Sequence, residues 1–180
     1  MSLYTKYGDK GFTFTKLSVK TPKNHALVNF LGNLDELNCF VGSLAAQIST
    51  PSDKDFYDIV TKIMSVNFEI GAFLGYGTPL CFENLNTFIK VIEQQIDDLE
   101  SKNNPLSNFI LPTGSERSCS AHICRSVARR AERSIYEMEI MAEAELVIHF
   151  LNRISDYFFS LARTLNRLDG QAEIIWRSSK

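Results

Sequence analysis

The sequence has few of the features that would place it outside the cell, in a membrane or on a nucleic acid. Its 180 residues include only four cysteines, with no CxxC pair, so we expect reduced thiols and a cytoplasmic location. No apolar run approaches the roughly 20 residues that span a bilayer, and the N-terminal region shows no signal or transit pattern. The formal charge of −2 provides no positive field for nucleic acid or an anionic membrane. We therefore expect an untargeted protein that binds neither, and any anion must be bound by a local cluster.

Metal-binding and hydrolase motifs are also scarce. Cys119, His122 and Cys124 lie at i, i+3 and i+5, a spacing that spreads ligands around a helix and fits no zinc class. Glu145 and His149 are four residues apart, where di-iron bundles use Glu-x-x-His. A GxSxG elbow is missing, and no nucleophile and base pair stands out. If the chain is an enzyme, we expect its nucleophile to belong to a cofactor.

What the sequence does contain is helical periodicity. Apolar residues make up 44% of the chain and charged residues 22%, which is typical of a packed globular protein. Apolar positions recur every three or four residues over long stretches, the pattern of amphipathic helices. The predicted helices cover approximately residues 27–48, 53–70, 84–101, 115–141 and 144–168.

These five segments, with almost no strand candidates between them, predict an all-α fold. We expect a five-helix bundle with ferritin-like up-and-down packing, a four-helix core plus one, in a single domain covering 1–180. Residues 1–23 form an N-terminal arm, 24–169 the bundle and 170–180 a C-terminal tail. The arm is expected to be ordered, or ordered by a ligand, around a turn bracketed by Gly8 and Gly11.

A stripe of arginines runs along the fourth predicted helix. Arg125, Arg129 and Arg133 lie at i, i+4 and i+8, so their guanidinium groups share roughly one face. Such a stripe can bind a polyphosphate, because arginine stays charged and presents a planar fork of donors. The alternative is an ordinary solvated helix face.

Polar residues also interrupt two other apolar patterns. On the fifth helix Asn152 and Asp156 lie one turn apart; Asp156 can pair with an arginine of the bundle, and Asn152 can bond backbone groups or hold a ligand. On the first helix, Asp35 can find an arginine across an interface, with a structural pair as the alternative. In the arm, glycines let backbone amides approach phosphate while Lys6 and Lys10 neutralise it, although a surface turn also explains this motif.

Taken together, four stretches resemble the PduO-type ATP:cob(I)alamin adenosyltransferases, the corrinoid adenosyltransferases. They are 4–11, 34–38, 109–114, and the run 125–133 followed by 151–156, in the family's order. Each motif is weak alone, but four in register make the match specific.

The resemblance implies an enzyme that transfers the 5′-deoxyadenosyl group of ATP to the cobalt of cob(I)alamin, giving adenosylcobalamin and triphosphate. It further implies Mg²⁺, a reductase that supplies an electron, and a homotrimer with ATP and the corrinoid meeting between neighbouring subunits. The alternative is a non-catalytic corrinoid-binding carrier or regulator. A helical interaction module, whose arginine stripe meets an acidic partner, is a third interpretation.

The resemblance also assigns roles to individual residues. Arg125 pairs with Asp35 of a neighbouring subunit, and Phe109 lies beneath the corrin ring, where it excludes water and an axial base and leaves the cobalt four-coordinate. Glu132 is the Mg²⁺ position. The implied catalytic residues are Arg125, Arg129, Asp35 and Phe109, and the implied ligand-binding residues are Thr5, Lys6, Gly8, Asp9, Lys10, Gly11, Lys23, Arg129, Glu132, Asn152 and Phe109.

Two positions depart from the family pattern. Phe12 stands where the arm usually has a small hydroxyl residue, which puts one ATP contact in doubt. Thr113 replaces the first glycine of the usual Pro-Gly-Gly, and we expect it to stiffen the corrin loop because glycine alone tolerates every backbone region. Neither departure removes a charged group.

Overall fold

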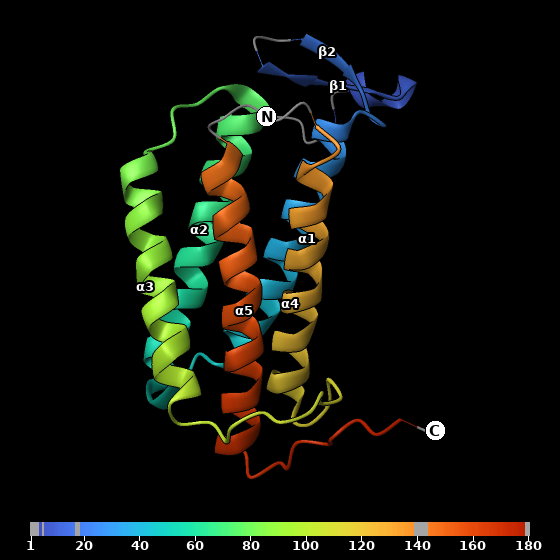
Figure 1. Cartoon of the computed structure of the whole chain (residues 1–180). Helices are drawn as coiled ribbons and strands as arrows, with labels where there is room; N and C mark the ends of the chain where they lie inside the picture. The colour runs from blue at the N-terminus through green and yellow to red at the C-terminus, as the bar shows by residue number, and fades with distance from the viewer. Residues whose placement is uncertain (1–3, 5, 17–18, 139–143, 179–180) are drawn as a thin grey trace.

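The computed structural model (Figure 1) describes residues 4, 6–16, 19–138 and 144–178, and its main body is a bundle of five helices. The all-α prediction is confirmed. Each helix runs opposite to the one before it, so the chain passes up and down the bundle (Figure 1). The helices are α1 Ala26–Gln47, α2 Lys54–Tyr76, α3 Phe82–Glu100, α4 Glu116–Ile135 and α5 Ala144–Leu168.

The predicted apolar stripes form one core. Helix α5 packs against α3 and α4, and α1 packs against α2 and α4. Large side chains such as Phe30, Leu37, Phe150 and Phe158 are fully buried in the contacts between them, which is the burial that stabilises amphipathic helices. Leu168, the last predicted apolar position of α5, is instead half exposed at the helix end. Within the described residues, no helix combines the length and the hydrophobicity that a membrane span requires.

Two helix boundaries differ from the prediction. Helix α2 does not stop at Gly71 but continues to Tyr76 and ends at Gly77, whose left-handed φ of 76° closes the last turn. The helix tolerates Gly75 because the glycine admits Leu31 of α1: a Cβ there would lie 3.0 Å from a Leu31 methyl group. Helix α4 ends at Ile135 rather than near residue 141, and 139–143 lie outside the described residues.

The arm contains a small two-stranded β-hairpin, which the sequence analysis did not predict. A short 3₁₀ turn, η1 Tyr7–Lys10, precedes β1 Phe12–Thr15 and β2 Val19–Pro22, which pair antiparallel. Alternating threonine and aromatic residues favour an extended backbone, and the buried Thr15 and Thr21 hydroxyls share a hydrogen bond of 2.7 Å. The hairpin lies at the end of the bundle where α1 begins (Figure 1).

At the opposite end, the loop before α4 is joined to the tail after α5. The Leu111 amide donates to the Ile174 carbonyl at 2.8 Å, the Trp176 amide donates to the Phe109 carbonyl at 2.8 Å, and Ile110 and Ile175 form an antiparallel bridge. The tail is therefore an ordered strand-like partner of the loop that carries Phe109.

Candidate active site

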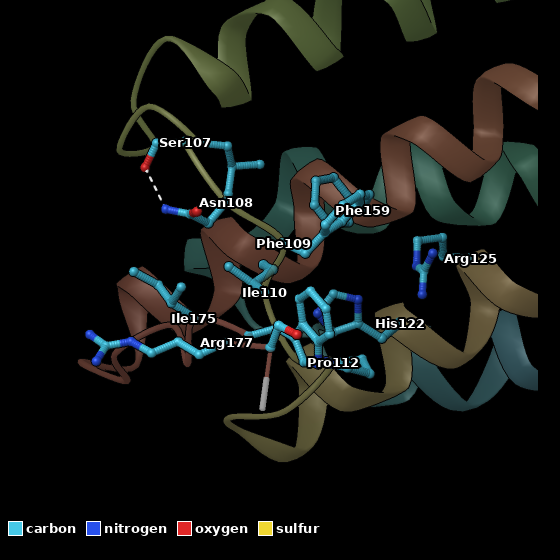
Figure 2. A pocket seen from close by; sticks show the side chains of 13 residues that line it. Ser107, Asn108, Phe109, Ile110, Pro112, His122, Arg125, Phe159, Ile175 and Arg177 are labelled. Carbon is cyan, nitrogen blue, oxygen red and sulfur yellow. Dashed lines mark hydrogen bonds between the residues drawn. The ribbon is translucent and has the colours of Figure 1, made fainter. Parts of the chain in front are cut away.

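A cavity of about 1080 Å³ opens at this end of the bundle. The loop forms one wall, α4 and α5 form the floor, and the tail closes the third side (Figure 2). Most of the lining is apolar, with a histidine and an arginine contributed by α4. The lining residues are Leu106, Ser107, Asn108, Phe109, Ile110, Pro112, His122, Arg125, Phe159, Ile175, Trp176, Arg177 and Ser178.

Phe109 is the most exposed large apolar side chain of the cavity, at 81%. An aromatic ring held in solvent costs free energy unless a ligand covers it. Its loop is held from below by the buried Asn166, whose Nδ2 donates to the Thr113 carbonyl and whose Oδ1 accepts from the Ser115 amide, both at 2.9 Å. The fold therefore presents Phe109 on a braced loop.

The hydrogen bonds from Asn166 to the loop also show which loop position needs glycine. Gly114 has a left-handed φ of 136°, and a Cβ there would lie 1.9 Å from the Asn166 Oδ1 atom. Thr113 has no positive φ, so this position accepts a side chain without backbone strain. The expected stiffening of the loop by Thr113 stays a prediction.

His122 lies in the cavity floor and is 5% exposed. Both of its ring nitrogens lack a hydrogen-bond partner among the described residues. Burial lowers the pKa of His122 to about 4, and the positive charge of Arg125 lowers it further in the same direction. The imidazole is therefore neutral at physiological pH.

Arg125 is a half-buried cation without an anion. It makes no hydrogen bond or ion pair with the part of the chain that the structure describes, and its guanidinium lies 6.0 Å from the centre of the Phe159 ring. Burial lowers the pKa of Arg125, and the neighbouring charge of Arg129 acts in the same direction. A partly buried guanidinium without a counter-ion is stabilised when a carboxylate or phosphate binds it.

Asp35 does not meet Arg125 within one subunit. It is exposed on α1 and lines a separate groove of about 230 Å³ beside Asn38 and Phe68. Neither residue has an ion-pair partner among the described residues. The predicted Arg125–Asp35 pair therefore needs a second subunit.

Farther along α4, the structure brings two of the predicted site residues together. Asn152 Nδ2 donates to Glu132 Oε1 at 3.0 Å, so α5 and α4 hold the two side chains side by side. Arg129 and Arg133 are exposed, as the solvated-face alternative proposed. Asp156 pairs at 3.0 Å with Arg153 of its own helix, an arginine of the bundle as expected for a structural pair.

The arm residues gather at the hairpin. The Lys23 ammonium lies against Gly8, where a Cβ would be 3.0 Å from Nζ, and the Lys23 amide donates to the Gly11 carbonyl at 2.9 Å. Lys6, Asp9 and Lys10 are exposed, so the turn presents its lysines to solvent. Thr5 lies outside the described residues.

Phe12 occupies the start of the hairpin. Its half-buried ring stacks under the Lys20 ammonium, which lies 4.3 Å from the ring centre, a cation–π contact. Phe12 thus has a packing role in the arm.

The hairpin of the arm and the loop between α3 and α4, which contains Phe109, lie at opposite ends of the bundle (Figure 1). Helix α4, which runs from the cavity toward the hairpin, has 20 residues and so extends about 30 Å. The arm and the Phe109 loop are therefore far apart within one subunit, and Arg125, Arg129 and Glu132 are spaced along α4 between them.

A family model matches almost the whole arrangement. The model for cobalamin adenosyltransferases covers residues 3–165, from the arm through nearly all of α5. The chain belongs to the cobalamin adenosyltransferase family.

Curated relatives agree with this membership over nearly the full chain. The human corrinoid adenosyltransferase MMAB is 36% identical over 97% of this chain and 72% of its own length. The corrinoid adenosyltransferase of Bacillus subtilis is 34% identical over 99% of this chain and 94% of its own length. The corrinoid adenosyltransferase PduO of Salmonella typhimurium is 29% identical and is matched over 54% of its length.

Solved structures of the family have the same fold. A variant of the PduO-type ATP:corrinoid adenosyltransferase from Lactobacillus reuteri, complexed with cobalamin and ATP, superposes with a TM-score of 0.86 at 31% identity, covering 99% of this chain and 98% of its own. Another variant of that enzyme, complexed with ATP, gives a TM-score of 0.84 at 31% identity, over 97% of this chain and 100% of its own.

Metal ligands in this cobalamin adenosyltransferase chain are sparse. Among the described residues, no group of three or more His, Cys, Asp or Glu side chains is placed to hold a metal ion. Glu132 offers a carboxylate whose Oε2 has no hydrogen-bond partner within the described ranges. A single carboxylate fits Mg²⁺ carried by a nucleotide, because that ion is held mainly by phosphate oxygens and water.

Several residues that line the cavity were not predicted as site residues from the sequence. Trp176 and Arg177 come from the tail, His122 was considered only as a zinc ligand, and Phe159 was hidden in the apolar stripe of α5. One sequence feature could have indicated that the tail packs against the bundle: the single tryptophan of the chain follows Ile174 and Ile175 in an otherwise polar tail.

Proposed function

We propose that the chain transfers the 5′-deoxyadenosyl group of ATP to the cobalt of cob(I)alamin, releasing triphosphate. Family membership supports this proposal, and so do relatives that are named corrinoid adenosyltransferases. The observation that carries it is the cavity of about 1080 Å³ in which Phe109 is held 81% exposed on a braced loop. A flat, apolar macrocycle is the ligand that such a surface accepts.

Phe109 would lie against the lower face of the corrin ring. An apolar ring in this place excludes water and an axial base, so the cobalt becomes four-coordinate and easier to reduce. The tail residue Trp176 and the helix residue Phe159 extend the same apolar surface. The protein thereby prepares the corrinoid for reduction before the transfer.

The transfer needs no nucleophile from the protein. Cobalt(I) attacks the 5′ carbon of ATP, the cobalt–carbon bond forms, the carbon–oxygen bond breaks, and its electron pair leaves on the triphosphate. The side chains supply orientation and charge neutralisation of that leaving group. Arg125 and Arg129 on α4, with Lys6, Lys10 and Lys23 of the arm, are the cations we assign to it.

The site is shared between subunits in this proposal. The arm and the loop that carries Phe109 lie at opposite ends of α4, whose 20 residues extend about 30 Å, whereas triphosphate and the 5′ carbon belong to one small molecule. Asp35 and Arg125 also each lack an ion-pair partner within the described residues of one subunit. In a closed ring of three subunits, the arm of one subunit could reach the cavity of the next. Asp35 of one subunit could also pair with Arg125 of its neighbour, which gives both residues a partner.

The Mg²⁺ that accompanies ATP would be held by Glu132, with Asn152 orienting the carboxylate through its hydrogen bond of 3.0 Å. The ion would supply charge neutralisation on the triphosphate. A reductase that delivers one electron to the corrinoid and a cytoplasmic location complete the proposal.

The test is an anaerobic assay with chemically reduced cobalamin, ATP and Mg²⁺, in which the visible spectrum reports conversion to adenosylcobalamin. Conversion that depends on the protein and on ATP supports the proposal. Corrinoid binding without conversion would favour the carrier alternative instead. The exposed lysines of the arm and Arg129, which a carrier does not need, speak against that outcome.

A further inference from the structure

A second cavity of about 540 Å³ lies beside the first, at the same end of the bundle. It opens between the loop 103–108 and the tail 170–175, with the end of α5 as its floor. The two cavities share Leu106, Ser107, Asn108, Ile110 and Ile175 in their linings. The Phe109 loop and its bridge to the tail are therefore a partition between two neighbouring chambers.

The second cavity has more polar side chains in its lining than the first, beside apolar ones such as Leu106 and Ile175. Side-chain amides of Asn103, Asn104, Asn108 and Gln171 line it, together with two guanidinium groups and one carboxylate. One of these guanidinium groups is already neutralised: the Arg163 side chain is 1% exposed and forms ion pairs of 2.6 Å with both Glu173 and Glu100. Arg163 is thus a structural brace and not a free binding group.

Arg167 is in a different state. Its Nε donates to Asn103 Oδ1 at 3.4 Å, a weak contact, and the guanidinium has no carboxylate partner among the described residues. Arg167 is exposed, so it is solvated and available. Arg163 is balanced by its two carboxylates, so Arg167 is the cation of this lining that has no carboxylate partner within the described ranges and can bind an anionic ligand.

One unpaired arginine, several amides and a few apolar side chains fit a ligand that has an anionic group and is attached to the molecule in the first cavity. A corrinoid has such a part: a nucleotide tail with a phosphodiester, a ribose and a base, connected to the edge of the ring. The base is also the axial ligand that Phe109 keeps away from the cobalt, so a bound corrinoid must place it elsewhere. We propose that the second cavity receives this displaced nucleotide tail and that Arg167 binds its phosphodiester.

This inference rests on the proposed function, and it adds a reason why the base leaves the cobalt. When Phe109 displaces the base from the cobalt, the cobalt–nitrogen bond is lost, and this loss costs free energy. Hydrogen bonds from Arg167 and the surrounding amides to the tail offset part of that cost, because a charge-assisted hydrogen bond is stronger than a neutral one. The second cavity would thereby favour the base-off form of the substrate.

The test compares two corrinoids: cobalamin, which carries the tail, and cobinamide, which has the same ring without the nucleotide. In Arg167→Gln, we expect the ratio of KM for cobalamin to KM for cobinamide to rise about tenfold over the wild-type ratio, with KM for ATP unchanged. Gln171→Glu, which adds a negative charge to the lining and keeps Arg167, should raise the ratio in the same direction. An unchanged ratio in both variants overturns the proposal.

Lys102→Gln is the matched control. Lys102 is exposed at the same end of the bundle and lines neither cavity, so the loss of its charge should leave the ratio at the wild-type value. An equal rise in this variant would mean general electrostatic attraction and would overturn a specific site. Thermal unfolding of each variant shows whether the fold is intact.

A binding titration separates this inference from the proposed function. Quenching of the single tryptophan, Trp176 in the wall of the first cavity, measures affinity for both corrinoids without turnover. If the wild-type protein converts neither corrinoid, the proposed function fails. The tail site stands if cobalamin still binds more tightly than cobinamide and Arg167→Gln removes the difference, and it fails if the two bind equally.

Discussion

Glu132 and Asn152 meet across the contact between α4 and α5, where Asn152 Nδ2 donates to Glu132 Oε1 at 3.0 Å. The bond orients the carboxylate and leaves Oε2 without a partner among the described residues. Loss of a ligand or its orienting group commonly costs 10- to 100-fold in metal affinity or activity. The pair is therefore the most direct test of the nucleotide end of the site.

For Glu132→Gln we expect the Mg²⁺ concentration at half-maximal activity to rise about tenfold or more, because an amide is a poorer Mg²⁺ ligand than a carboxylate. Activity as a function of Mg²⁺ at fixed ATP measures this. Glu137→Gln is the control: Glu137 is exposed just beyond the end of α4 and accepts from Asn29 at 3.3 Å. An equal effect in both variants would contradict the assignment.

Arg125→Ala should weaken both turnover and subunit assembly. The half-buried cation has no anion within the described part of its own subunit, and we propose the triphosphate, a neighbouring subunit, or both as its partner. We expect kcat to fall about 10²-fold and the mass measured by light scattering to decrease from that of the proposed trimer. Arg125→Lys should keep part of the assembly but little of the turnover, because lysine lacks the planar fork. Unchanged kinetics and mass in Arg125→Ala would refute both roles.

Phe109→Ala should bind the corrinoid but fail when the reaction starts from cob(II)alamin. Without the ring, a lower ligand returns to the cobalt and makes its reduction harder. Starting from chemically reduced cob(I)alamin should restore most of the rate. Leu111→Ala, on the same loop but outside the cavity lining, is the control. Wild-type rates from cob(II)alamin in Phe109→Ala would reject this role.

His122 should make the protein less stable in mild acid. The pKa of His122 is about 4 in the folded protein and 6.5 when unperturbed, so between these values the unfolded chain binds the proton and the folded chain does not. The contribution of His122 to the free energy of unfolding is fully present above pH 6.5 and is lost as the pH drops toward 4. At pH 5 the loss is about 2 kcal/mol. Urea unfolding of the wild type and of His122→Asn at pH 7 and pH 5 measures the difference. An identical pH dependence in both proteins would exclude His122 as the cause.

The helices were predictable because their apolar stripes repeat over many turns, and α5 matches its predicted limits closely. The end of α2 was missed because glycine propensity suggested a stop, whereas packing against Leu31 favours continuation. The hairpin was missed because its strands have four residues each, too few for a clear alternating pattern.

The candidate site was predictable only in part, for a different reason. Individual positions such as Phe109 and Glu132 came from the family resemblance, since no periodicity distinguishes them. The contact of the tail with the loop joins Phe109 to Trp176, residues far apart in the chain, and local pattern carries no information about such pairing. Arg167 was hidden for the same reason, because its surroundings come from three separate segments.

The separation of the arm from the Phe109 cavity has a genetic consequence. If each site takes its arm from one subunit and its cavity from the next, two different defective alleles can complement each other. Subunits with Lys10→Ala, mixed with subunits carrying Phe109→Ala, would form some sites in which both halves are intact. Activity would then reappear in the mixture although neither homotrimer is active, and the recovered fraction would report how often unlike subunits are neighbours.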